Sequence, residues 1–92
     1  MKEHKDASDR PLIELSDLDS DLLFRKLADR LKNVFNAKII EKVEGVDQRY
    51  WDFDVDGTIV VLHSDPMAGI SIHIEDGSNE NLLRKIASML LD

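Results

Sequence analysis

The 92-residue sequence contains no cysteine, only two prolines and four glycines, and a single tryptophan. Without cysteine the chain can form neither a disulfide framework nor a thiolate metal site, and it has no thiol nucleophile. This composition is typical of a reducing compartment. The charged beginning of the chain shows no signal peptide, and no apolar run is long enough to cross a bilayer. The sequence therefore predicts a cytoplasmic protein that does not bind membranes.

Basic residues are also scarce, since 12 lysines and arginines stand against 19 aspartates and glutamates, for a formal net charge of −7. Coulomb repulsion then opposes binding to nucleic acid or to anionic lipid, and a basic protein partner is favoured instead. A chain of this length forms one domain and buries only roughly 60% of its unfolded surface. Such a core leaves little room for a large enclosed active site.

The composition changes near residue 10. Residues 1–10 are charged and polar without periodicity, which predicts a disordered N-terminal arm, and residues 11–92 then form a single α+β domain. The short apolar segment Pro11–Leu15 is expected either as an extra N-terminal edge strand, which would suit its proline, or as a segment laid against the domain.

Two consecutive β-hairpins are predicted between Tyr50 and Glu75. Large apolar side chains alternate with aspartates over Trp51–Asp56, which is the period of a half-buried strand, and Asp56-Gly57 is a strong signal for a type I′ turn. In that register Phe53 faces Val60. A third strand with inward isoleucines follows at Gly69–Glu75.

The remaining elements complete the predicted fold. Capping residues before Leu23 begin a helix that stops near Asn36, and a second amphipathic helix ends the chain. Ala37–Glu44 is a strand candidate with Ile40 and Lys42 on the outer face, near the outward aspartates, and Glu41 on the inner face. We therefore expect an α+β fold: a four-stranded antiparallel β-meander with two helices packed on one face, in the order α-β-β-β-β-α.

The outer face of this sheet is unusually apolar, because Ile59-Val60-Val61-Leu62 does not alternate. This face could be covered by the segment around Leu12–Leu15, by a second copy or by another protein, or it could simply expose a few β-branched side chains. The predicted register sets His73 in one row with Asp54 and Ile59, too far from the aspartate for a compact metal or acid/base site. The candidate interface residues are Ile40, Tyr50, Ile59, Val61, His63 and His73.

The segment Asp54-Val55-Asp56-Gly57-Thr58 resembles the first motif of the haloacid dehalogenase superfamily. The resemblance implies Asp54 as nucleophile, Asp56 as acid and base, and a bound Mg²⁺. That motif belongs at the end of a buried parallel strand in a longer domain, whereas here an alternating strand precedes it and few residues follow. Asp52, Asp54 and Asp56 also imitate the start of a calcium loop, but His63 stands where the bidentate glutamate belongs.

The sequence thus favours a non-enzymatic protein-binding or assembly module without cofactor or metal. We expect a homodimer or a protein partner, engaged through the outer sheet face or an edge strand, with no nucleic acid and no membrane. The alternative is Mg²⁺-dependent phosphoryl transfer, or another metal-binding function, at the Asp52, Asp54 and Asp56 cluster.

Overall fold

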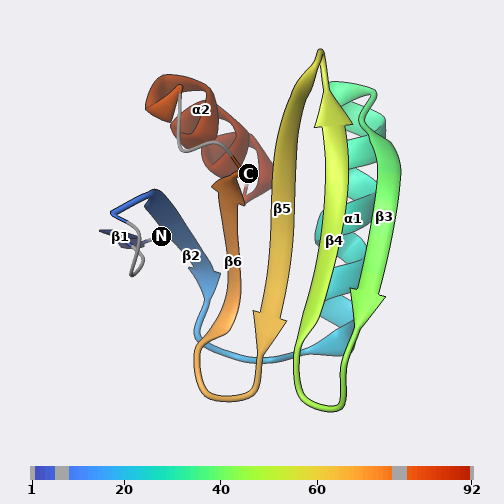
Figure 1. Ribbon diagram of the computed structural model, residues 1–92, viewed down its shortest axis with the longest axis vertical. Coiled ribbons are helices and arrows are strands. Elements are labelled where there is room, and N and C mark those ends of the chain that lie inside the picture. Colours follow the sequence, from blue (N-terminus) through green and yellow to red (C-terminus); the bar gives the residue numbers. More distant parts are fainter. Residues whose placement is uncertain (1, 6–8, 76–78, 92) are drawn as a thin grey trace.

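The computed structural model describes residues 2–5, 9–75 and 79–91, which form one six-stranded antiparallel sheet with two helices on one face (Figure 1). In chain order the elements are β1 (Lys2–Lys5), β2 (Pro11–Ser16), α1 (Asp21–Phe35), β3 (Lys38–Glu44), β4 (Arg49–Val55), β5 (Thr58–Asp65), β6 (Gly69–Ile74) and α2 (Glu80–Leu90). The strand order across the sheet is β1-β2-β6-β5-β4-β3. No helix in the described ranges is long and apolar enough to cross a membrane.

The prediction of a four-stranded meander in the order α-β-β-β-β-α is therefore wrong. Strands β3 to β6 do form a meander, but β2 pairs with β6 and β1 pairs with the other side of β2. The segment considered for an edge strand thus lies inside the sheet, where Ile13 is 1% exposed and packs in the core. Because β6 is far away in sequence, no local pattern indicates this pairing.

β1 lies within the segment 1–10, for which the composition predicts a disordered arm. All four of its side chains are exposed, so it has no apolar pattern that could reveal a strand. It is held by its antiparallel pairing with β2 and by an ion pair to α2, in which Arg84 Nε lies 2.8 Å from Glu3 Oε1. Backbone pairing with a buried neighbour explains a strand that hydrophobic periodicity cannot show.

The first predicted hairpin is confirmed. Val55 pairs with Thr58 and Phe53 pairs with Val60, as the alternation requires. At the tip, Asp56 has φ 50° and Gly57 has φ 86°, so both residues take the left-handed conformation of a type I′ turn.

One core fills the space between the helices and the inner face of the sheet. Helix α1 begins after Ser20, whose side chain accepts from Leu23 N, and ends at Asn36 in the left-handed conformation, which confirms the predicted stop. Edge-to-face packing of Phe24 on Trp51, with ring centroids 4.9 Å apart, joins α1 to β4. The helices meet where Arg30 Nη2 donates to the Met89 carbonyl at 2.7 Å.

A β-bulge in β3 reverses the predicted faces of its second half. Ile39 pairs with Phe53, but Glu41 pairs with Asp52, so the register shifts at Ile40. Lys42 consequently turns to the inner side, where its Nζ lies 4.2 Å from the centre of the Trp51 ring. The expected pairing of Lys42 with the outward aspartates is wrong, and Glu41 stands beside them instead.

Candidate functional site

The outer face of the sheet is the surface on which the sequence places its candidate residues. Both helices lie on the opposite side, and among the described residues no element covers the outer face (Figure 1). Its side chains form rows across the strands. One row runs through Tyr50, His63, Ser71 and Glu14, and the next runs through Asp52, Val61, His73 and Leu12.

The structure brings several of the predicted interface residues together. Tyr50 and His63 stack with ring centroids 4.2 Å apart and an interplanar angle of 4°. Val61 and His73 are direct neighbours across β5 and β6. Val61 is only 6% exposed, so its neighbours on this face already bury most of it. Ile59 is half-buried beside Asp54, whereas Ile40 lies apart on the bulge at the sheet edge.

The predicted row of Asp54, Ile59 and His73 is wrong, because His73 pairs with Val61 and not with Ile59. Strand β5 continues to Asp65, which pairs with Gly69, so a tight turn connects β5 to β6. The backbone N of Met67 bonds to the Asp65 carboxylate at 2.7 Å and stabilises this tight turn. His73 therefore shares its row with Asp52, with Val61 between them.

Three carboxylates crowd one part of the outer face. Asp52 stands opposite Glu41, and partial burial together with the negative charges of Glu75 and Glu41 raises the pKa of Asp52 above its usual range. Because the bulge in β3 turns Lys42 away, the expected positive neighbour of Asp52 is missing from this face. We call these three carboxylates, Asp52, Glu41 and Glu75, the acidic flank; they lie beside Ile59 and Val61.

His63 is a partly buried titratable side chain on the outer face. Its Nε2 atom is buried and has no hydrogen-bond partner among the described residues. Desolvation lowers the pKa of His63, although Asp65 and Asp19 act in the opposite direction. Burial therefore disfavours the positively charged form of this imidazole.

Asp54, which belongs to both sequence motifs, has a structural role. Gly57 N donates to Asp54 Oδ1 at 2.8 Å, so this carboxylate stabilises the hairpin turn. All strand pairings of the described residues are antiparallel, whereas the haloacid dehalogenase motif requires a parallel strand. The described part of the chain also holds no group of three histidine, cysteine, aspartate or glutamate side chains arranged to bind a metal.

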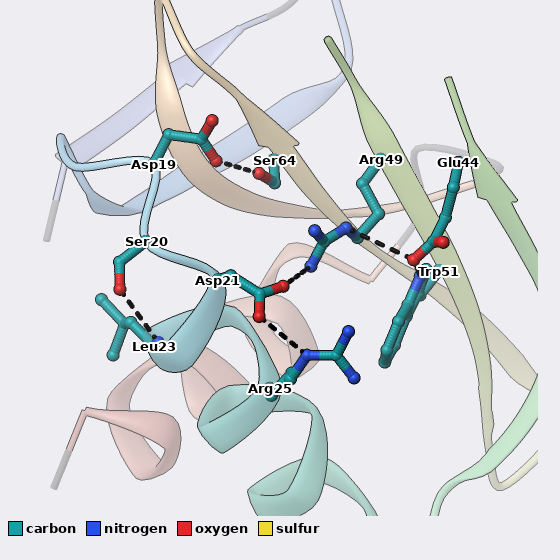
Figure 2. Close-up of polar contacts among 9 residues, drawn as sticks. All are labelled: Asp19, Ser20, Asp21, Leu23, Arg25, Glu44, Arg49, Trp51 and Ser64. Atoms are coloured by element: carbon teal, nitrogen blue, oxygen red, sulfur yellow. Dashed lines mark hydrogen bonds and ion pairs between the residues drawn. The ribbon is translucent and has the colours of Figure 1, made fainter. Parts of the chain in front are cut away.

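A second polar cluster surrounds the start of α1, and sequence reasoning missed its long-range contacts (Figure 2). Asp21 bonds to Arg25 Nε at 2.9 Å and to Arg49 Nη1 at 2.8 Å, and hydrogen bonds from Arg25 and then Arg49 lower the pKa of Asp21. The Asp19 carboxylate accepts a hydrogen bond from the Ser64 hydroxyl. The sequence analysis assigned the aspartates to capping, and only the fold shows that they also join α1 to β4 and β5.

The polar contacts of this cluster connect α1 to the sheet, and they leave little capacity for binding a ligand. The Arg49 guanidinium lies 4.7 Å from the centre of the Phe24 ring and 3.5 Å from Glu44 Oε1, which in turn accepts from Trp51 Nε1 at 3.3 Å. Arg49 is thus already held by two carboxylates and an aromatic face. A polar hollow of about 220 Å³ beside it is lined mainly by the β3–β4 turn.

Comparison with known proteins gives a family but no activity. No curated protein and no solved structure matches the chain. Residues 1–90 match the family model described as "Protein of unknown function (DUF3630)". Because the match covers almost the whole chain, the protein belongs to the DUF3630 family.

Proposed function

We propose that this protein is a non-enzymatic binding module whose outer sheet face docks a protein partner that carries basic side chains around an apolar contact. The observation that carries the proposal is the acidic flank. Asp52 has a raised pKa because of burial, Glu75 and Glu41, and it lies beside the apolar pair Ile59 and Val61. A face that combines crowded carboxylates with apolar side chains complements a cationic, partly apolar surface.

Sheet edges are less suitable for docking than the outer face. Strand β3 has a bulge and carries Lys38 and Lys42, and both features discourage the addition of another strand. The opposite edge, β1, is four residues long and consists of two lysines, a glutamate and a histidine, all exposed. The proposal therefore assigns binding to side chains of the outer face.

Self-association is the competing mode for the same face. Two copies joined through it would bring the carboxylates of Asp52, Glu41 and Glu75 near their own equivalents, at a net charge of −7 for each chain. Like charges across an interface cost several kcal/mol in order of magnitude. A basic partner removes this repulsion, and a second copy adds to it.

The test compares variants of the outer face with a matched variant of another surface. Ile59→Asp adds a charge to the acidic flank and should abolish partner capture, and Ile59→Lys should do the same without further acidic crowding. Leu22→Asp is the control, because Leu22 is 67% exposed on α1, away from this face. Amide spectra establish that each variant is folded.

The partner is captured from native extract by the wild-type chain, purified, and titrated while amide shifts are recorded. Shifts concentrated at residues of β4, β5 and β6 on the outer face support the proposal. Capture that survives both Ile59 variants, or shifts confined to the helices, contradicts it. Sedimentation of the pure chain distinguishes the modes: we expect a monomer, and a dimer that Ile59→Lys dissociates would assign the face to self-association.

A further inference from the structure

A hollow opens in the outer face where β1, β2 and β6 meet the β5–β6 turn. Its volume is about 320 Å³, and it is lined by His4, Leu12, Glu14, Ala68 and Ser71. We call this feature the Glu14 hollow. It belongs to neither sequence motif, and it lies beside the Tyr50 and His63 stack along the same row of the sheet.

The hollow arises from side-chain size. In the register, Ser71 stands between His63 on β5 and Glu14 on β2, so a small side chain separates two larger ones. Ala68, at the end of the turn, is equally small. Side chains on one sheet face stand roughly perpendicular to it, and a short one between longer neighbours leaves a depression.

The lining combines apolar walls with one carboxylate. Leu12 and Ala68 provide apolar surface, and the Glu14 side chain is only 20% exposed. Glu14 Oε2 lies 3.5 Å from His4 Nε2, and this ion pair carries charge on both sides only when the imidazole is protonated. Lys2 stands opposite Glu14 in the register, but its side chain is exposed. A half-buried carboxylate in such surroundings favours an additional cation.

We propose that the Glu14 hollow receives an arginine side chain of the partner, with the aliphatic stem against Leu12 and Ala68 and the guanidinium on the Glu14 carboxylate. The Ser71 hydroxyl oxygen is placed to accept a further N–H. Arginine suits the site better than lysine, because its planar guanidinium is weakly hydrated and offers several donors at once. This inference rests on the proposed function and names the anchor of the same face.

The test needs no partner. The full chain is titrated with N-acetylargininamide, and the amide shifts of Leu12, Glu14 and Ser71 are followed. N-acetylcitrullinamide, which has almost the same shape without the charge, is the matched probe. We expect arginine to bind about tenfold more tightly than citrulline, since a charge-assisted hydrogen bond in a half-buried site has an effect of that order.

Two variants locate the effect. Glu14→Gln should remove the preference for arginine, and Ser71→Val, which fills the hollow without changing charge, should weaken both probes. Asp54→Asn removes the same charge from the same face outside the hollow and should change the affinity by less than about twofold, since exposed charges at a distance are screened. Equal binding of the two probes, an equal loss in Asp54→Asn and Glu14→Gln, or no shifts at these residues would overturn the inference.

The two proposals can fail separately. If arginine does not bind but the Ile59 variants still abolish capture of the partner, the outer face is a docking surface and its anchor lies elsewhere. If arginine binds at Glu14 but the Ile59 variants leave capture intact, the hollow is real and the apolar pair is not the interface.

Discussion

The two faces of the sheet are made by alternating residues of the same strands, yet their environments differ completely. On the inner face, Phe53, Val60 and Leu62 are each 0% exposed beneath the helices. On the outer face, Asp52, Ile59 and His63 are only partly buried and have no covering layer among the described residues. The comparison teaches that folding uses one face almost entirely and leaves the other available for recognition.

The difference is sharpest within β5. Its inward side chains are apolar at Val60 and Leu62, between Thr58 at the start of the strand and Ser64, which bonds to Asp19. Its outward residues include two β-branched side chains and a histidine. A strand that served only the core would carry polar residues outward. Ile59, Val61 and His63 are therefore the positions where stability alone does not explain the residue type.

The largest expected loss of stability comes from a substitution on the inner face, compared with one on the outer face. Phe53→Ala removes a fully buried ring and leaves a cavity between sheet and helices, so we expect a loss of about 3–5 kcal/mol in the free energy of unfolding. Ile59→Ala should cost about 1 kcal/mol or less, because Ile59 is half-buried on the open face. Urea denaturation measures both values. Equal losses would mean that the outer face is packed as tightly as the core.

The second comparison concerns two glycines with the same backbone conformation. Gly69 has φ 82°, and a Cβ there would lie 2.1 Å from the Ser16 carbonyl oxygen and 2.8 Å from Asp17 Cα, where the connection between β2 and α1 crosses the start of β6. We expect Gly69→Ala to cost on the order of 2–4 kcal/mol, from strain and backbone displacement together.

Gly57 is the matched control, since it has φ 86° and open space around the added methyl group. Gly57→Ala should cost only about 1 kcal/mol, the price of the left-handed conformation alone. Thermal or urea unfolding of the two variants gives the difference. If both substitutions have the same small effect, the close approach of residues 16 and 17 to β6 does not persist in solution.

Local patterns in the sequence predicted local structure well. Asp56-Gly57 with alternating neighbours fixed the register of β4 and β5, and Asn36 marked the end of α1. Both depend on residues close together in the chain. The place of β2 inside the sheet depends on its pairing with β6, far along the chain, so its short apolar sequence indicated a strand but not this position. β1 pairs locally with β2, but its four polar residues contained no hydrophobic signal for a strand.

The sequence predicted which face of the sheet carries the candidate residues, but not which of their side chains are neighbours. Ile59 and Val61 are outward because period 2 is a property of any strand. The bulge at Ile40 adds one residue to β3, and the tight turn after Asp65 shifts the pairing of β6 by two residues, so each moves every later side chain. Those two shifts turned Lys42 inward and moved His73 beside Val61, and nothing in the local composition indicates either of them.

A pH dependence is expected at His63, with a smaller effect than at the glycines. Burial lowers its folded-state pKa below the unfolded value, so the unfolded chain binds the proton more readily. The stability from this group is complete above the unfolded pKa and is lost as pH falls. His63→Phe keeps a ring against Tyr50 and removes the titration, so its stability should fall less than that of the wild type between about pH 7 and about pH 5. Parallel curves in urea denaturation would contradict the burial of this imidazole.

The smallest effect is expected at Asp52, and its sign is opposite. The folded-state pKa of Asp52 is raised, so the native chain binds the proton more readily than the unfolded chain, and ionisation destabilises the fold as pH rises through the folded pKa. Asp52→Asn should therefore gain stability relative to the wild type between about pH 3 and about pH 6.

Asp47→Asn, in the exposed β3–β4 turn, is the control for a simple change in net charge and should show no such gain. A wild-type chain that is more stable than Asp52→Asn at neutral pH would show that these carboxylates assist folding. The expected result would show that folding tolerates these carboxylates in spite of their mutual repulsion, as the proposed binding of a basic partner requires.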